Sequence, residues 1–427
     1  MTNEVQSLLV IGGGHAAGQL LDSVRQEGFT GNIKLISEEG MLPYQRPHLS
    51  KLYLSGELAT EKLLYRPEKF YQENQIEVLL NTRVESIDRD KRLVQLGDGQ
   101  QLPYHKLALT TGARVRKLEL PGSNVKGVHY LRSIADTDSI REDLESAKKV
   151  VLLGGGFLGL EAASVITSMG KSATVLEVQS RVMANAVAPE VSAYYEKLHS
   201  ENGVSIQCGN AVSSINVEQD RISGVTCDNG EVHNADLLII SVGIRPNEEL
   251  ASAAGLECDN GICVNEYAQT SDADIVAAGD CTQHPNGFLQ RNLRLESVHN
   301  AVEQAKTAAA SICGKQRLYK QVPWFWSDQY RSRLQMVGVP QDKDERVIRG
   351  ELEQGRFSVL FFRNGKLSAC HAVNRPADYM SCRKILENNI PLSAEQAASM
   401  TFDLAALVPS QTRLAFQKRE QQAASTV

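Results

Sequence analysis

Two short glycine-rich segments carry residue types suited to holding a phosphate. Both fit the spacing G-x-G-x-x-G/A, with Gly12, Gly14, His15, Ala16 and Ala17 in the first and Gly154, Gly156, Phe157, Leu158 and Gly159 in the second. In this pattern the first glycine permits a tight turn, the second lets a pyrophosphate approach the backbone, and the third small residue lets a helix pack on a strand. The N–H groups that begin the helix then face the phosphates. Each segment therefore predicts a dinucleotide site.

An acidic residue follows each segment where it can accept the ribose hydroxyls of a bound dinucleotide. Glu38 ends the strand after the first segment, and Glu177 lies 23 residues after Gly154. A carboxylate repels a 2′-phosphate, so Glu177 favours NADH over NADPH, although Arg181 follows closely and keeps the alternative open. Two such sites predict hydride transfer between a nicotinamide and a flavin. These residues alone leave open which site holds which cofactor.

The elements that must position the glycines occur twice. Apolar strand-like runs precede the two segments at residues 8–11 and 150–153, and second strands follow at 33–36 and 173–176. Hairpin turns at residues 98–99 and 229–230, where glycine permits positive φ, then close two small β-meanders. Residues 357–362 and 366–372 read as a further hairpin, followed by a helix at 377–387. The repeat predicts an α/β protein with two Rossmann-like domains and a C-terminal α+β domain.

Composition narrows the function classes. The 427 residues carry a net charge of −6, and this acidic balance argues against a nucleic-acid binder or a protein held on an anionic membrane by charge. Residues 150–169 are apolar, but their four glycines fit a strand, a turn and a helix better than a membrane span. Eight cysteines without a C-x-x-C pair favour reduced thiols in a cytosol, and the nine histidines form no metal-binding pattern.

A longer set of motifs resembles the FAD-dependent, NADH-linked ferredoxin reductases, which include putidaredoxin and rubredoxin reductases and the reductases of aromatic-ring dioxygenases. The motifs run in the family's order through residues 43–51 (PYQRPHLSK), 110–114 (TTGAR), 129–132 (HYLR), 156–161 (GFLGLE), 277–281 (AAGDC), 294–298 (RLESV) and 322–329 (VPWFWSDQ). The resemblance is specific for the family and does not name the physiological partner.

The resemblance implies FAD in the first site and NADH in the second. The FAD contacts that it implies, besides Gly12 to Ala17, are Glu38, Arg46, Lys51, Val84, Thr111, Gly112, Arg132, Asp280 and Val298. The NADH contacts that it implies are Gly154 to Gly159, Glu161, Glu177 and Gly243. The residues expected to act directly in the reaction are Lys51, Glu161 and Trp326.

The resemblance also implies a protein that accepts electrons in pairs and passes them on one at a time. Hydride passes from NADH to FAD, and electrons then pass singly to a [2Fe–2S] ferredoxin or a rubredoxin that serves a P450 or Rieske-type oxygenase. Because such carriers are acidic and this chain is acidic too, docking needs a local positive patch. The candidates are Arg291, Arg294, Arg331, Arg333 and Arg375. Trp326 and Trp324 either lie between flavin and docking surface or anchor the C-terminal core.

The expected organisation is glutathione-reductase-like. A discontinuous FAD domain is expected at residues 1–115 and 245–320, an NAD domain at 116–244 and a C-terminal domain at 321–427, with a polar tail after Gln411. Disulfide reductases of this plan need a redox cysteine in the first FAD unit, and residues 1–207 contain no cysteine. Two other functions stay open: an NADH oxidase or apoptosis-inducing-factor-like flavoprotein that reduces oxygen or a quinone, and a non-enzymatic NADH-sensing interaction module.

Overall fold

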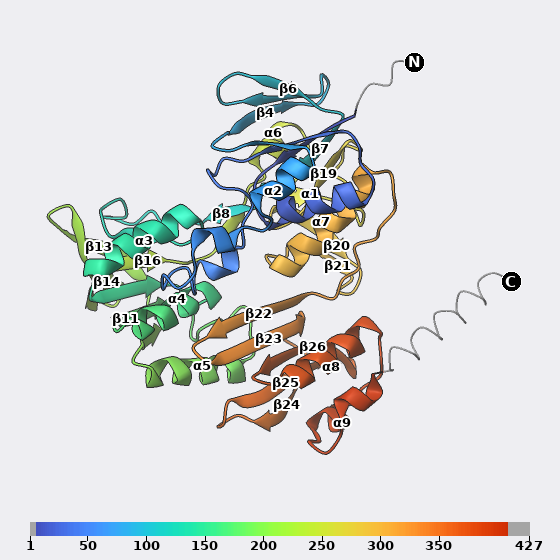
Figure 1. Cartoon of the computed structure of the whole chain (residues 1–427). Coiled ribbons are helices and arrows are strands. Elements are labelled where there is room, and N and C mark those ends of the chain that lie inside the picture. The colour runs from blue at the N-terminus through green and yellow to red at the C-terminus, as the bar shows by residue number, and fades with distance from the viewer. Residues whose placement is uncertain (1–5, 409–427) are drawn as a thin grey trace, which may run out of the picture. The chain divides into compact units, whose positions relative to one another are not determined.

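The structure is a computed structural model and describes residues 6–408, so the tail predicted after Gln411 lies outside the described residues. The described chain forms two compact units (Figure 1). Residues 6–183 with 196–321 make the first unit, and residues 184–195 with 322–408 make the second. Helix α5 (Pro189–Glu201) contains residues of both.

The first glycine segment belongs to a five-stranded parallel sheet. Its strands, in spatial order, are β19 (Ile275–Ala277), β7 (Lys106–Leu109), β1 (Ser7–Ile11), β2 (Asn32–Ile36) and β3 (Ile76–Leu79). On one face, Leu8 and Val10 pack against α1 (His15–Gln26) and α7 (Val298–Ile312), which lie side by side in Figure 1. On the other face, Leu9 and Ile11 pack against a β-meander of β4 (Val84–Asp88), β5 (Leu93–Leu96) and β6 (Gln101–Pro103).

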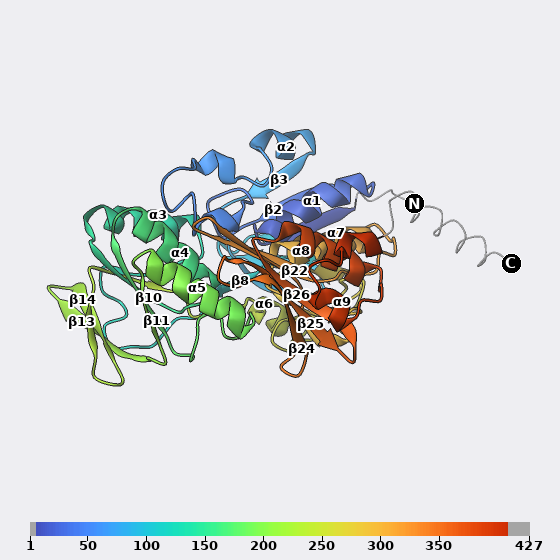
Figure 2. The same cartoon turned by 90° about the horizontal axis from the view of Figure 1, so that it is seen from below.

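A second parallel sheet repeats this plan around the second glycine segment. Its spatial order is β12 (Ser205–Cys208), β11 (Ser172–Glu177), β10 (Lys149–Leu153), β16 (Leu237–Ile240) and β9 (Val128–Tyr130). Val151 and Leu153 face a meander of β13 (Val212–Glu218), β14 (Arg221–Cys227) and β15 (Val232–Asn234). The helices beside this sheet in Figure 2 are α3 (Ile134–Ser146) and α4 (Phe157–Ser168).

Shorter elements complete the first unit. They are the paired strands β8 (Ala113–Val115) and β17 (Ile244–Pro246), the strands β18 (Ile262–Cys263), β20 (Thr282–Asn286) and β21 (Arg291–Leu293), the helices α2 (Glu68–Glu73) and α6 (Glu249–Ala253), and the 3₁₀ turns η1 (Arg46–His48) and η2 (Thr60–Leu63).

The second unit is built on an antiparallel sheet. Its order is β22 (Trp324–Gln329), β23 (Ser332–Gly338), β26 (Lys366–Val373), β25 (Arg356–Arg363) and β24 (Glu345–Glu351). The helices α8 (Pro376–Glu387) and α9 (Ala394–Ala398) and the turn η3 (Leu404–Leu407) follow. The hairpin and helix predicted at residues 357–387 are confirmed. So are the turns at 98–99 and 229–230, where Gly99 and Gly230 have positive φ.

Candidate functional site

The first glycine segment joins β1 to α1 through a turn that glycine accommodates. Gly12 has φ +104°, and a Cβ added there would lie 2.3 Å from the carbonyl oxygen of Thr110. A Cβ added at Gly14 would meet no atom within 4 Å, so the turn borders open space at that residue. Gly14 is the N-cap residue of α1 and has no side chain to cap the helix start. An uncapped helix start with room beside it fits the pyrophosphate of a dinucleotide.

Cationic side chains converge on the same helix start. Burial and then the charges of Arg46, Arg132 and His48 lower the pKa of His15, the first residue of α1, to about 4. Burial is the largest of these causes, and the charges of Arg46 and Arg132 add to it by disfavouring a further proton, so a positive potential at the start of α1 contributes to the low pKa of His15. Arg46 Nη1 donates to the carbonyl oxygen of Arg132 at 2.8 Å, which holds the two residues together. This potential favours a bound dianion.

Arg46 is oriented by an acid and a phenol that the sequence analysis does not single out. Its guanidinium pairs with the carboxylate of Glu39 and donates to the Tyr44 hydroxyl at 2.9 Å. Tyr44 is buried and donates its own proton to Glu39 at 2.5 Å. The neighbouring acid, Glu38, which the sequence assigns to the ribose, is exposed and pairs with Arg83 at 3.1 Å.

Asp280 follows β19 at the carboxyl edge of the first sheet, where sheets of this type bind ligands. Its carboxylate pairs with Arg132 Nη2 at 3.1 Å. The preceding residue, Gly279, has φ +93°, and a Cβ there would lie 3.1 Å from the Cβ of Ala16 and 3.8 Å from that of Ala301. Because Ala16 and Ala301 belong to the first turns of α1 and α7, two helix N-termini converge next to Asp280.

The second glycine segment has the same backbone form. Gly154 has φ +104°, and Gly156, the N-cap residue of α4, provides no side-chain cap and borders open space. A Cβ on Gly159 would lie 2.1 Å from the carbonyl oxygen of Gly154, so no larger residue fits without moving the helix. Glu177 Oε2 accepts the backbone N–H of Gly155 at 2.6 Å. The predicted ribose acid therefore touches the glycine turn itself.

A buried ion pair links the segment after β2 to the helix of the second site. Glu161 on α4 is 5% exposed, and its Oε2 accepts from Lys51 Nζ at 2.5 Å and from Ser50 Oγ at 2.6 Å. Ser50 is fully buried. Lys51 and Glu161, predicted separately as residues of the flavin and nicotinamide sites, are thus brought together across 110 residues of sequence.

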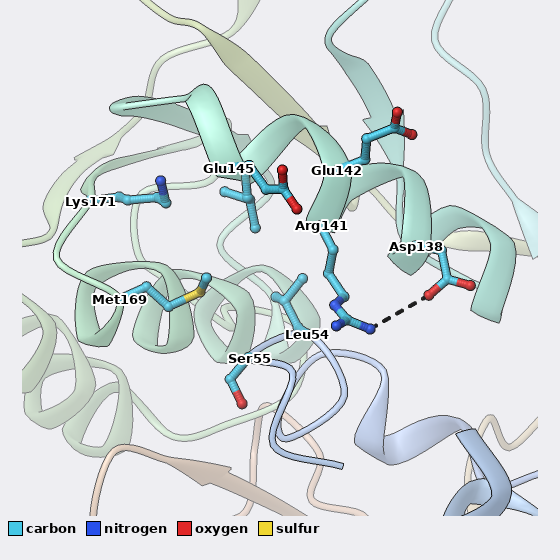
Figure 3. Close-up of a pocket in the computed structure, with 9 residues that line it drawn as sticks. Leu54, Ser55, Asp138, Arg141, Glu142, Glu145, Met169 and Lys171 are labelled. Carbon is cyan, nitrogen blue, oxygen red and sulfur yellow. Dashed lines mark ion pairs between the residues drawn. The ribbon is translucent and has the colours of Figure 1, made fainter. Parts of the chain in front are cut away.

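A second contact joins the segment after β2 to α3, a few residues beyond Lys51. Tyr53 donates its hydroxyl proton to Asp138 Oδ1 at 2.8 Å, and the Arg141 guanidinium lies over the Tyr53 ring, 5.4 Å from its centroid. Figure 3 shows Leu54 and Ser55 of this segment opposite Asp138 and Arg141 of α3, where they line a cleft of about 490 Å³. Sequence reasoning missed Tyr53 and Asp138, since neither belongs to a recognisable pattern.

The remaining predicted cofactor residues lie at turns and element ends of the first unit. Thr111 Oγ1 donates to the Asn247 carbonyl at 2.7 Å, and Gly112 has φ +64°. Gly243 has φ +103° and borders open space. The other predicted residues lie where helices and strands begin. Val84 is the first residue of β4, Phe157 and Leu158 are the first two of α4, and Val298 is the first of α7.

The predicted acceptor-side residues are divided between the units. In the first unit Arg291 is exposed and Arg294 pairs with Glu296. In the second unit Trp326 is partly buried on β22 and Arg331 is exposed, while Arg333 pairs with Asp328 at 3.2 Å and Arg375 pairs with Asp378. Neither Trp326 nor Trp324 is fully buried, and their rings lie 5.5 Å apart.

Fold and site together define a protein with two dinucleotide-binding sites in one unit. Comparison with known proteins agrees. Residues 6–305 match the family model of the pyridine nucleotide-disulphide oxidoreductases, and residues 324–408 match the reductase C-terminal model. Rhodocoxin reductase of Rhodococcus erythropolis is 42% identical over 93% of each chain. Rubredoxin-NAD(+) reductase of Pseudomonas putida is 38% identical over 87% of this chain and 96% of its own.

Solved structures give the same result. The ferredoxin reductase for the CYP199A2 system of Rhodopseudomonas palustris has a TM-score of 0.92 and 40% identity, over 95% of this chain and 100% of that one. The reductase of the covalent putidaredoxin reductase–putidaredoxin complex has a TM-score of 0.92 and 37% identity, over 95% and 98%.

The chain belongs to the pyridine nucleotide-disulphide oxidoreductase family, and the resemblance to NADH-linked ferredoxin reductases is confirmed. It is an oxidoreductase, and its cofactors are FAD and NAD(H), the pair that this family uses. Within residues 6–408 no helix is both long enough and apolar enough to cross a membrane. The same residues contain no cluster of three or more His, Cys, Asp or Glu side chains arranged to hold a metal ion.

Proposed function

We propose that this protein is an NADH:ferredoxin or NADH:rubredoxin reductase that serves a P450 or Rieske-type oxygenase. FAD supplies the chemistry, because it accepts a hydride from NADH and releases electrons one at a time. The observation that carries the proposal is the Lys51–Glu161 pair, which joins the segment beside the first glycine site to the helix that begins at the second. The carriers named for several relatives, putidaredoxin and rubredoxin, support the choice of acceptor.

The first site is the proposed FAD site. Its uncapped α1 start and the positive potential at His15 suit the pyrophosphate, and Asp280 suits the ribitol hydroxyls. In the proposed arrangement the start of α7 at Val298 lies near the flavin edge, where the helix dipole would stabilise the anionic reduced ring. The other proposed FAD contacts are Gly12 to Ala17, Glu38, Arg46, Lys51, Val84, Thr111, Gly112 and Arg132.

The second site is the proposed NADH site. Glu177 accepts ribose hydroxyls and disfavours a 2′-phosphate. Within the proposed contacts Gly154 to Gly159 and Gly243, Gly156 and Gly243 border open space where the cofactor can approach the backbone, and Gly154 and Gly159 pack closely to form the turn. The proposed role of Lys51 and Glu161 is to hold the segment after β2 against α4, which would fix the two cofactor sites relative to each other, and the burial of Ser50 and Glu161 excludes water from this ion pair.

The proposed acceptor contacts are Trp326, Arg331, Arg333 and Arg375 of the second unit and Arg291 and Arg294 of the first, which the sequence assigns to a positive patch. Opposite charges across a docking surface raise the association rate and make it salt-dependent. Reversal of Arg331 and Arg333 to Glu is expected to slow ferredoxin reduction and flatten its salt dependence, while ferricyanide reduction survives. Unchanged ferredoxin kinetics in this double variant would remove the patch from the proposal.

The proposed domain limits are residues 1–115 with 245–320 for FAD, 116–244 for NAD and 321–427 for the C-terminal domain. A cytosolic location is proposed because the eight cysteines are all free thiols.

The test of function is a reconstituted electron-transfer assay. Purified holoprotein is mixed with NADH, a [2Fe–2S] ferredoxin or a rubredoxin, and cytochrome c as the final acceptor. The proposal expects cytochrome c reduction that depends on the added carrier. Rapid NADH consumption in air that no carrier accelerates would instead identify an NADH oxidase, and would overturn the proposed acceptor.

A further inference from the structure

A buried amide on α7 holds the turn that presents Asp280. Gln304 is 1% exposed, and its Oε1 accepts the backbone N–H of Gly279 at 2.8 Å and the hydroxyl of Thr282 at 2.9 Å. These two donors flank Asp280 in the chain. One side-chain oxygen of α7 therefore contacts the chain on both sides of Asp280.

A second buried amide continues the contact toward the start of α7. Asn300 lies one turn before Gln304, is fully buried, and has its Nδ2 3.5 Å from Gln304 Oε1. The same Nδ2 donates to the Leu295 carbonyl at 3.0 Å, and Asn300 Oδ1 accepts the Tyr319 hydroxyl at 2.6 Å. The network thus ties both the segment that enters α7 and a residue beyond its end to the first turn of the helix.

The packing at Gly279 makes this network sensitive to small shifts. A Cβ on Gly279 would lie 3.1 Å from Ala16 of α1 and 3.8 Å from Ala301 of α7, so little free space separates the three backbones. Close-packed interiors transmit such displacements rather than absorb them. Loss of the Gln304 acceptor is therefore expected to move Asp280 and the α7 N-terminus relative to each other.

We propose that Gln304 and Asn300 are positioning residues that set the FAD reduction potential. They hold the α7 N-terminus and Asp280 in one fixed geometry, so that the positive end of the helix stabilises the anionic reduced flavin more than the neutral oxidised one. The inference rests on the proposed FAD site. Neither amide is assigned contact with the cofactor, and both act through Asp280 and the helix start.

The test is the midpoint potential of the holoprotein, measured by anaerobic titration against a reference dye. Gln304→Met keeps a similar volume and removes the acceptor. We expect it to lose about tenfold in affinity for reduced relative to oxidised FAD, which for a two-electron couple is a shift of about 30 mV to more negative potential. Tyr319→Phe removes one bond to Asn300, and we expect a smaller shift in the same direction. If Gln304→Met fails to fold, the midpoint potential of Tyr319→Phe still tests the proposal.

Thr307→Val is the matched control, because Thr307 is also buried on α7, one turn beyond Gln304. It is expected to leave the potential unchanged. A purely structural role for the network predicts lower melting temperatures with wild-type potentials in Gln304→Met and Tyr319→Phe, and that result overturns the inference. An equal shift in Thr307→Val overturns it too. Failure of the wild-type protein to bind one FAD per chain would instead refute the proposed FAD site.

Discussion

Proton uptake on FAD binding is the most direct test of the first site. Burial, Arg46, Arg132 and His48 lower the pKa of His15 from 6.5 to about 4 in the protein without cofactor. A pyrophosphate at the start of α1 brings negative charge next to the same imidazole, and an opposite charge favours the protonated form. FAD binding should therefore raise the pKa of His15, and the complex should bind a proton that the free protein releases.

The pKa value sets the size of the effect. If binding returns the pKa of His15 from about 4 to its ordinary 6.5, the association constant for FAD rises as the pH falls through that window and levels off below about 4. Between pH 7.5 and pH 5.5 the calculated rise is about tenfold, or about 1.4 kcal/mol. Acid denaturation would give the opposite pH dependence, because it would weaken FAD binding as the pH falls.

The assay is a titration of the deflavinated protein with FAD, followed by quenching of flavin fluorescence at the two pH values. His15→Gln is the matched variant, since it removes the titrating group and keeps a polar side chain. We expect the tenfold difference in the wild type and little pH dependence in the variant. The same pH dependence in both proteins would refute the assignment of His15 to the field of the pyrophosphate.

Three further predictions follow from individual contacts. Glu177→Ala should raise the KM for NADH about tenfold, the loss of one charged hydrogen bond, and raise the NADPH/NADH ratio of kcat/KM; an unchanged ratio would contradict its proposed role. Tyr53→Phe removes the bond to Asp138 and should slow flavin reduction by NADH several-fold in stopped-flow measurements, whereas dithionite reduction should not change; equal slowing of both would point to general damage. His284 is buried, and burial lowers its pKa to about 4, so the stability that its neutral form contributes above pH 6.5 is lost as the pH falls toward 4. This loss amounts to about 3 kcal/mol of unfolding free energy, and His284→Phe should remove it from the pH profile; a wild-type profile in that variant would contradict it.

Local patterns predicted the parts of the fold that depend on local backbone physics. The apolar runs before Gly12 and Gly154 are central strands, β1 and β10, because parallel strands buried on both faces consist of continuous apolar residues. Asn229–Gly230 and Asn364–Gly365 are hairpin turns in which Gly230, Asn364 and Gly365 have positive φ, which glycine and asparagine adopt at little cost. Each signal lies within a few residues of the structure that it specifies.

The side-chain contacts of the site could not be predicted in this way. Glu161 meets Ser50 and Lys51 across about 110 residues, and no spacing rule links a position in α4 to a loop after β2. Gln304 carries no motif of its own, and its role depends on the approach of Gly279 to α7. Such contacts depend on how the two repeats and strand β19 pack in three dimensions. A sequence pattern does not specify this packing.

The two glycine turns share a backbone but differ in charge, and this difference explains how one plan serves two cofactors. At the first turn, burial lowers the pKa of His15 and the charges of Arg46 and Arg132 lower it further, and the positive potential of these two arginines favours a dianion that stays bound. At the second turn Glu177 already accepts the N–H of Gly155, so an incoming dinucleotide must share that carboxylate. A resident flavin suits the first environment, and a nicotinamide that must leave after each turnover suits the second.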